Sequence, residues 1–391
     1  MARLLLTIVL LFFLSSCSSD DKEKLVIRFA HFWTEPNQQK MIDSLIVIFE
    51  TNNPEIRIEQ IPLQWNEGRT KLLLAHSSSQ KPDITHIGIE WSQEFINAKV
   101  FMPLILDDSS IPKQFHEQMR GSDGKIYCIP WTMNTRALVL THELSDLNDS
   151  LSWQDIITSK LDGAVFGINA SEKHNVMKRI LPILWSGGSI IFTKLPLSET
   201  CDEKLLEGLH VLSDLQKNGI LEQSRILDQY LIQGKIRATL TGQWMLPQLE
   251  SIPHKVLARI PGISGASILS GDCLGISSDT KHIDESIRFV QFITKYEQSR
   301  FLCTSIPDAG IPAHITSFSD SIFTVDIDRK AFLQQCTISM ILPSPVYFQD
   351  AEEIFEEHIM RYVYGKISDK ECMESMKKGF QSLEEKNKKG S

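Results

Sequence analysis

The stretch "LVIRFAHFWTEPNQQKMIDSLIVIFETNNPEIRIEQIP", residues 25–62, decides the fold because its hydrophobic period changes twice. Residues 25–32 alternate loosely between apolar and other side chains, as a strand does. "QQKMIDSLIVIFETNN" then predicts a helix, since its apolar residues share one helical face: Met41, Leu45, Ile48 and Phe49. Asn53-Pro54 ends that helix, because a residue before proline disfavours the helical conformation. "EIRIEQIP" alternates again, so strand, helix and strand follow one another.

The same order continues beyond residue 62. We expect a helix over residues 68–77, a strand over 83–90 ("DITHIGIE") and a helix over 92–99. Strands that alternate with helices imply a parallel sheet with right-handed crossovers, and therefore an α/β fold. In such sheets ligands bind beyond the carboxyl ends of the strands. The stretches that directly follow the strands are "WTEP" (33–36), "LQWNEGR" (63–69) and "EW" (90–91).

The rest of the chain has a different pattern. Residues 121–147 predict two short strands separated by a turn and a tryptophan segment, and residues 171–250 are mostly helical in pattern. A Gly/Ser-rich loop over residues 261–273 precedes the strand "LGISS". Further helices are expected towards the end, over residues 283–296, 329–336, 351–364 and 369–385.

A short apolar run, residues 4–14, lies near the N-terminus. At about 1.5 Å per residue, a helix of that length cannot cross a bilayer core of about 30 Å. Arg3 precedes the run and small residues follow it, as in a secretory signal. "LSSC" at residues 14–17 resembles the lipobox of bacterial lipoproteins, in which cleavage leaves an acylated cysteine. We therefore expect a signal peptide over residues 1–16, an acyl anchor on Cys17 and a tether over 17–24; a buried helix of the mature domain is the alternative.

Composition limits the function classes. A net charge of −9 argues against nucleic-acid binding, which needs a basic stripe. The length suggests two domains or one large one. The six cysteines after Cys17 are far apart and form no CxxC pair, which makes a zinc site improbable and leaves disulfides and buried thiols equally open. We expect no metal and no cofactor.

Several further motifs, taken in order, carry a resemblance to a known family. They are "FWTEP", "FETNNPEIRIE", "KPDITHIGIEW", "DGKIYCIPW", "ILWSGGSIIF", "GKIRATLTGQW", "SILSGDCLGISS", "IRFVQFITKYEQSRFL" and "ILPSPVY". Together they resemble the family 1 extracellular solute-binding proteins of sugar ABC importers, which are similar to maltose-binding protein, over nearly the whole mature chain. The sequence departs from the family pattern at "KPD" (81–83) and at Thr141-His142. The second departure puts in doubt any ligand contact that the family makes there.

The resemblance implies a periplasmic-binding-protein type II fold, in which two α/β lobes are joined by hinge strands and a ligand cleft lies between them. We expect residues 25–133 and 279–335 in lobe 1, and residues 134–278 and 336–391 in lobe 2. The chain would cross between the lobes near residues 131–136, 277–280 and 334–338.

Tryptophans near the starts of loops are the candidate ligand contacts. A sugar offers an apolar CH face and a rim of hydroxyls, which aromatic planes with polar neighbours complement. The tryptophans with such neighbours are Trp33, Trp65, Trp91, Trp131, Trp185 and Trp244. The polar neighbours that we expect to contact the ligand are Glu35, Arg69, Glu90 and Asn134. Each tryptophan could instead fill a lobe's core, and each glutamate could favour the positive end of a helix. Trp153 is interpreted as a packing residue.

"TLTGQWMLPQLE" (239–250) gives the sharpest candidate. Residues 238–241 predict a strand, Gly242 permits a tight turn, and Trp244 falls in the first turn after the strand. In the family this "GxW" tryptophan commonly stacks on the sugar, and Gly242 and Trp244 match it residue for residue; packing under the next helix is the alternative. Tyr347, at the end of "ILPSPVY", completes the candidate ligand-binding set.

The sequence therefore predicts an exported, lipid-anchored solute-binding protein of the cell envelope. It would capture a mono- or oligosaccharide or a related polyol and deliver it to the transmembrane subunits of an ABC permease. We expect a monomer that contacts the membrane only through its N-terminal lipid. No phosphate-loop, zincin or serine-hydrolase motif is present, so we expect no enzyme. A glycoside hydrolase that uses a carboxylate pair such as Glu35 and Glu90, and a receptor that presents ligand to a sensor, are the alternatives.

Overall fold

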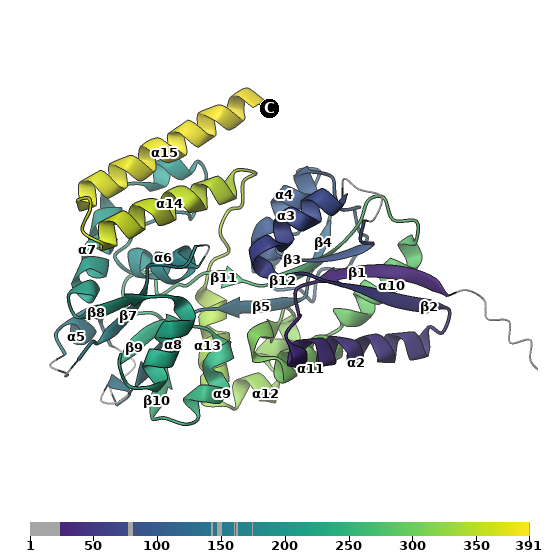
Figure 1. The fold of residues 1–391 in the computed structure, drawn as a ribbon, viewed down its shortest axis with the longest axis horizontal. Coiled ribbons are helices and arrows are strands. Elements are labelled where there is room, and N and C mark those ends of the chain that lie inside the picture. Colours follow the sequence, from purple (N-terminus) through teal and green to yellow (C-terminus); the bar gives the residue numbers. More distant parts are fainter. Residues whose placement is uncertain are drawn as a thin grey trace, which may run out of the picture.

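The structure is a computed structural model that describes residues 24–76, 81–141, 144–146, 151–159, 161, 163–173 and 175–390. Cys17, the expected signal peptide and His142 lie outside the described residues. Two lobes lie side by side, each built on its own five-stranded sheet (Figure 1). A smaller three-stranded sheet lies between them. The two-lobed α/β architecture predicted from the sequence is thereby confirmed.

The first sheet has the strand order β2-β1-β3-β12-β4. β1 pairs in parallel with β2 and β3, as the alternating pattern predicted, whereas β12 runs antiparallel to β3 and β4. The strand bounds are Leu25–His31 (β1), Ile56–Pro62 (β2), Ile84–Gly88 (β3), Cys128–Pro130 (β4) and Asp272–Ile276 (β12). Its helices are Pro36–Asn52 (α2), Trp65–His76 (α3), Ser92–Asn97 (α4), Ile283–Ile293 (α10) and Tyr296–Ser305 (α11).

Local sequence explains the bounds of α2. Pro36 occupies the start of the helix, where its fixed φ angle suits the first turn and its missing N–H is not needed. The Gln38 side chain accepts a hydrogen bond from the Glu35 backbone N–H at 3.1 Å, which caps the same end. Asn53-Pro54 ends the helix, as the sequence predicted.

The second sheet has the strand order β10-β6-β9-β7-β8. Its strands are Ala137–Thr141 (β6), Phe166–Asn169 (β7), Gly219–Glu222 (β8), Ala238–Thr241 (β9) and His254–Val256 (β10). Its longer helices are Val176–Ser186 (α6), Glu203–Lys217 (α7), Ser224–Ile232 (α8), Phe348–Val363 (α14) and Asp369–Gly390 (α15). Two short helices, Trp153–Ile157 (α5) and Leu246–Leu249 (α9), complete this lobe. In Figure 1, α14 and α15 cross its outer side as the two yellow helices.

The small sheet joins the lobes. It contains Thr132–Thr135 (β5), Leu269–Ser270 (β11) and Ile311–Pro312 (β13), in the order β11-β5-β13. β5 leads from the first sheet to the second, and β11 leads back. Two helices follow β13 in the chain, Ser321–Thr324 (α12) and Ile327–Ile338 (α13). The described residues include the 3-10 turns Ile89–Trp91 (η1), Lys113–Phe115 (η2), Leu197–Thr200 (η4), Gln243–Met245 (η5), Pro307–Ala309 (η6) and Ile315–Phe318 (η7).

One part of the expected lobe division is wrong. Residues 272–276 were assigned to lobe 2, yet β12 pairs with β3 and β4 in the first sheet. The second passage between the sheets therefore occurs at β11, earlier than the expected 277–280. β5 falls within the expected first crossing, and the expected third crossing falls at the end of α13. The other lobe boundaries stay a prediction.

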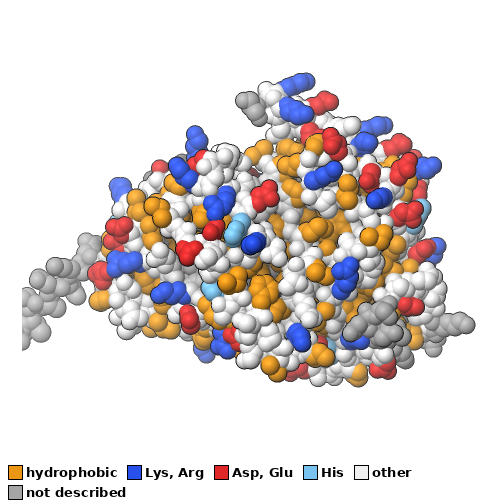
Figure 2. Space-filling view, turned by 180° about the vertical axis from the view of Figure 1, so that it is seen from behind, with side chains coloured by type: hydrophobic (Ala, Val, Ile, Leu, Met, Phe, Trp, Pro, Cys, Tyr) orange, Lys and Arg blue, Asp and Glu red, His pale blue; other side chains and the backbone are white. Residues whose placement is uncertain are grey.

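One face of the molecule has mixed charge. On the face shown in Figure 2, acidic and basic side chains of the described residues are interspersed, without a continuous stripe of one sign. No helix in the described part of the chain is both long and apolar enough to cross a membrane.

Candidate functional site

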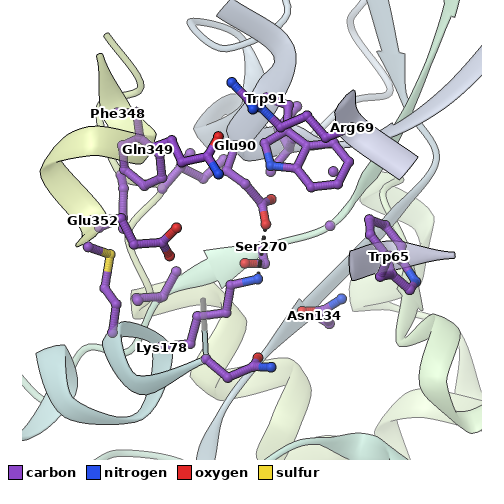
Figure 3. Close-up of a pocket in the computed structure, with 18 of the residues that line it drawn as sticks. Trp65, Arg69, Glu90, Trp91, Asn134, Lys178, Ser270, Phe348, Gln349 and Glu352 are labelled. Atoms are coloured by element: carbon purple, nitrogen blue, oxygen red, sulfur yellow. Dashed lines mark hydrogen bonds and ion pairs between the residues drawn. The ribbon is translucent and has the colours of Figure 1, made fainter. Parts of the chain in front are cut away.

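A cavity of about 420 Å³ lies between the two lobes. The first lobe contributes the starts of α3 and α4 and the end of β3, the second lobe contributes α6, α8 and α14, and β5 and β11 lie between them. Figure 3 shows side chains from both sides converging on this space. This position, beyond the carboxyl ends of the parallel strands, is the one that the sequence predicted.

Trp65 gives the first-lobe wall an accessible aromatic face. It is the first residue of α3, and 44% of its surface is exposed. Phe32 stacks beneath it, with ring centroids 4.1 Å apart and an angle of 17° between the planes. Gly68 makes this packing possible, because a Cβ there would lie 2.1 Å from the Phe32 ring. Trp91 stands beside Trp65 at 5.5 Å, so the wall presents two indole rings.

Arg69 lines the same wall and is fixed by Glu94. Its Nε donates to Glu94 Oε2 at 2.8 Å, and its Nη2 contacts Glu94 Oε1. Such two-point pairing orients a guanidinium strongly. The pair holds Arg69 beside the aromatic rings, where N–H groups could meet ligand hydroxyls.

Glu90 and Lys178 connect the two lobes. Glu90 follows β3, Lys178 lies in the first turn of α6, and Lys178 Nζ is 3.0 Å from Glu90 Oε1 (Figure 3). Burial opposes ionisation of Glu90, but Lys178, the Glu90 backbone N–H and Arg136 outweigh it and lower the pKa of Glu90. The carboxylate is therefore charged at neutral pH, and it reaches across the cleft.

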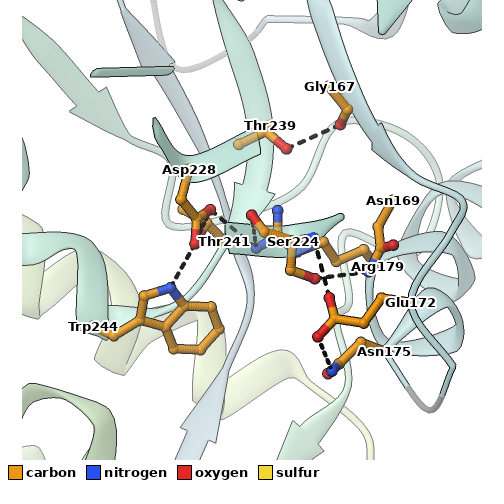
Figure 4. A network of polar contacts seen from close by, with 10 residues as sticks. All are labelled: Gly167, Asn169, Glu172, Asn175, Arg179, Ser224, Asp228, Thr239, Thr241 and Trp244. Carbon is orange, nitrogen blue, oxygen red and sulfur yellow. Dashed lines mark hydrogen bonds and ion pairs between the residues drawn. The ribbon is translucent and has the colours of Figure 1, made fainter. Parts of the chain in front are cut away.

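The second-lobe wall is organised by Asp228. Its Oδ1 accepts hydrogen bonds from Arg179 Nη2 at 3.0 Å and from the Thr241 hydroxyl at 2.8 Å. Its Oδ2 accepts from Trp244 Nε1 at 2.8 Å (Figure 4). Asp228 and Arg179 are buried, so each charge stabilises the other, and Trp244 is held at the cavity edge by the same carboxylate.

Six of the residues predicted from the sequence line this cavity. They are Trp65, Arg69, Glu90, Trp91, Asn134 and Trp244. They come from both lobes and from β5, and a ligand held between two lobes requires contacts from both of them. Their role in binding stays a prediction.

Three predicted tryptophans fill cores instead, and for them packing replaces the expected ligand contact. Trp33 and Trp131 belong to the hydrophobic cluster of the first lobe and are 4% and 1% exposed. Trp185 is fully buried in the second lobe, where its Nε1 donates to the Ile191 carbonyl at 2.8 Å. Trp153 is also a packing residue, as predicted, and bonds the Ser186 hydroxyl.

Three other predicted contacts lie outside the cavity lining. Glu35 is exposed at the start of α2, where it takes part in the cap. Tyr347 packs against the second-lobe core, while its neighbours Val346 and Phe348 line the cavity. Gly242 supports Trp244, because a Cβ at that position would lie 2.0 Å from the indole ring.

Sequence reasoning missed the charged residues of the second lobe. The cavity lining also includes Arg136, Asn175, Lys178, Arg179, Arg225, Ser270, Phe348, Gln349 and Glu352. "MKR" at residues 177–179 is an adjacent pair of cations at a helix start, which is the one local signal that could have drawn attention.

The cysteines after Cys17 all lie within the described residues. There, the six cysteines after Cys17 are buried free thiols. Within the same part of the chain, no group of three or more His, Cys, Asp and Glu is arranged to hold a metal ion.

Comparisons with known proteins agree with this arrangement. Residues 44–324 match the family described as bacterial extracellular solute-binding protein. An 82-residue segment is 30% identical to the putative ABC transporter periplasmic-binding protein YcjN of Escherichia coli K12. That segment covers 21% of this chain and only 18% of the E. coli protein.

Solved structures share the whole fold. The GacH receptor of Streptomyces glaucescens matches with a TM-score of 0.78 and 17% identity, over 92% of this chain and 98% of its own. Lmo0181 of Listeria monocytogenes matches with a TM-score of 0.76 and 16% identity, over 92% and 99%. The Listeria monocytogenes maltose-binding protein MalE gives 0.74 and 14%, over 92% and 98%. These likenesses are to substrate-binding proteins, so the chain is not assigned to the glycoside hydrolases. The resemblance stated from the sequence is confirmed: the chain belongs to the bacterial extracellular solute-binding protein family.

Proposed function

We propose that this protein captures a carbohydrate outside the cytoplasm and delivers it to the transmembrane subunits of an ABC importer. The observation that carries the proposal is Trp65, whose half-exposed ring faces a cavity between lobes and is backed by Phe32. A rigid aromatic plane beside Arg69, Glu90 and Asn134 complements the CH face and hydroxyl rim of a sugar.

The comparisons support the same ligand class. The related structures were solved with acarbose (GacH), cycloalternan (Lmo0181) and maltose (MalE). The E. coli relative is named as a periplasmic-binding protein of an ABC transporter, which supports a permease as partner. A ligand in this cavity would touch both lobes, so it would favour the form in which the lobes are closed.

Removal of the Trp65 ring tests the proposal. We expect Trp65→Ala to weaken binding of the best saccharide in a titration panel by about 10- to 100-fold, since a central aromatic contact contributes roughly 1.4–3 kcal/mol. The panel consists of neutral and acidic mono- and disaccharides, and affinity is measured by calorimetric titration. The melting temperature of the variant without saccharide should stay near that of the parent, because the ring is half-exposed.

Tyr364→Ala is the matched control, because Tyr364 is 50% exposed and lies outside the cavity lining. It should keep the parental affinity. Unchanged affinity in a folded Trp65→Ala protein would remove the aromatic platform from the site. If no saccharide binds the parent protein, the proposed carbohydrate function is wrong.

We also propose that Cys17 carries the lipid that holds the protein at the membrane. The support is the "LSSC" boundary at the end of an apolar run, in a chain whose family is extracellular. Several acyl chains give stable attachment where one holds only marginally, because each buried CH₂ contributes about 0.8 kcal/mol. Cys17→Ala should move the protein from the detergent phase to the aqueous phase in a Triton X-114 partition. Aqueous partitioning of the parent protein would contradict the anchor.

A further inference from the structure

Arg136 lines the cavity and makes no direct ion pair with a carboxylate among the described residues. Its Nη1 donates to the amide oxygen of Asn134 at 3.3 Å, and its guanidinium carbon lies 4.9 Å from the centre of the Trp244 ring. Its Nε is buried and has no acceptor among the described residues. Charged groups buried in proteins are normally paired, because removing them from water is costly. The positive charge in this position is therefore compensated only by the longer-range attraction of Glu90 and Asp228, without a directly bonded carboxylate.

The two carboxylates that attract Arg136, Glu90 and Asp228, are each hydrogen-bonded to other donors. Asp228 accepts from Arg179, Thr241 and Trp244, and Glu90 pairs with Lys178. Burial, followed by repulsion from Arg179, outweighs the attraction of Glu90 and Asp228 and lowers the pKa of Arg136 to about 10, which leaves it protonated at neutral pH. The charge is thus present at the pH at which a ligand would bind.

Two further guanidiniums, those of Arg225 and Arg179, lie near Arg136. Arg225 lies 5.3 Å from the Trp244 ring centre and also lines the cavity; its ion pair with Asp308, at 3.5 Å, is at the exposed rim. Arg179 Nη1 is a second buried donor without an acceptor among the described residues. Two buried guanidinium N–H groups of this wall, on Arg136 and Arg179, therefore have no acceptor among the described residues.

From this arrangement we propose that the ligand is an acidic carbohydrate whose carboxylate or phosphate group binds beside Arg136 and Arg225, while a sugar ring lies against Trp65. This inference rests on the proposed carbohydrate function and adds the charge of the ligand. Guanidinium groups match both anions well, because their N–H donors form a planar fork that meets two oxygens at once. Neutral hydroxyls would satisfy the donors but would leave Arg136 without a directly bonded anion.

The preference for acidic over neutral ligands can be measured with matched sets of saccharides. Each set contains a neutral sugar, its uronic acid and its 6-phosphate, in the glucose, galactose and mannose series, as monosaccharides and disaccharides. We expect the tightest binder to be acidic and to bind at least about 10-fold more tightly than its neutral counterpart, as for a charge-assisted hydrogen bond. The uronate and phosphate arms distinguish the two sources of negative charge.

Arg136→Gln should reduce the acidic-over-neutral preference to about one. Arg288→Gln is the control for loss of one positive charge, since Arg288 is on the outer face of α10 and outside the cavity lining, and it should keep the preference. Arg136→Lys should keep a part of it. Arg225→Gln provides the test if Arg136→Gln does not fold, because the Arg225 side chain is 63% exposed.

The inference is overturned if a neutral saccharide is the tightest binder. It is also overturned if Arg136→Gln weakens neutral and acidic members equally, since Arg136 would then only donate to hydroxyls. Both of those outcomes leave the proposed carbohydrate function standing. Binding of no saccharide of either kind would overturn the function and this inference together.

Discussion

Trp244 shows how the surroundings of one residue decide its role. The sequence left two interpretations open, a stacking platform and a core residue. The ring is half-buried at the cavity edge, its Nε1 is bonded to Asp228, and the guanidiniums of Arg136 and Arg225 lie against it. Trp244 therefore has two roles in the second-lobe wall: its ring contacts the cationic side chains of Arg136 and Arg225, and its remaining surface faces the cavity.

Gly242→Ala tests whether the orientation of the Trp244 ring affects saccharide binding. A Cβ at residue 242 would lie 2.0 Å from the indole, so the ring must move and its hydrogen bond with Asp228 must lengthen or break. The backbone itself tolerates alanine, since Gly242 has φ −110°. We expect saccharide affinity to fall by about 10-fold, the equivalent of roughly 1.4 kcal/mol, in calorimetric titration.

Trp244→Phe is the companion variant, because it keeps one aromatic ring and removes the five-membered ring whose N–H bonds Asp228. Its loss should be smaller, about 1 kcal/mol or less. Parental affinity in a folded Gly242→Ala protein would show that the orientation of Trp244 is irrelevant to binding.

At the level of single residues, sequence reasoning found the site where a local rule applied. Trp65, Trp91 and Glu90 follow strands of a parallel sheet, and that rule places them at the ligand edge. The same rule also selected Trp33, which turns into the core and stacks on His86. Only the packing of neighbouring elements separates the two outcomes, and no spacing in the sequence contains that information.

At the level of elements, alternation and caps predicted most of the first lobe. β1, α2 and β2 appear where the pattern of residues 25–62 placed them. β12 was misassigned because its partners, β3 and β4, are far away in the chain and its hydrophobic run has no mark of the sheet it joins. β7 and β8 were missed for a related reason: each has four residues, too few to show a period.

The elements that supply the cationic wall were equally hard to predict. Arg136 is between β5 and β6, Arg179 is in α6, and Arg225 is in α8. Arg179 follows β7, Arg225 follows β8 and Trp244 follows β9, and these strands are parallel. Arg136 directly precedes β6, which is antiparallel to β9, so all four residues lie at one edge of the sheet. A cluster formed by three such distant segments has no linear motif.

At the scale of the whole molecule, the Glu90–Lys178 pair makes lobe closure testable. The pair joins an element of the first lobe to one of the second, and both side chains are about one-fifth exposed. A partly exposed pair contributes about 0.5–1 kcal/mol, enough to shift an equilibrium between open and closed lobes by roughly two- to fivefold. Because the pKa of Glu90 is lowered, this contribution is complete above the usual glutamate pKa and is lost as the pH falls through the lowered value.

We therefore predict that Lys178→Met increases the radius of gyration of the protein in the absence of saccharide, as measured by small-angle X-ray scattering at neutral pH. The saccharide that binds best should reduce the radius of the parent protein, because contacts from both lobes favour the closed form. Lys217→Met is the control, since Lys217 pairs with Asp214 on the same helix and joins no lobes. An equal radius for the parent with and without saturating saccharide would contradict closure. An equal radius for Lys178→Met and Lys217→Met would instead show that the Glu90–Lys178 pair does not stabilise the closed form.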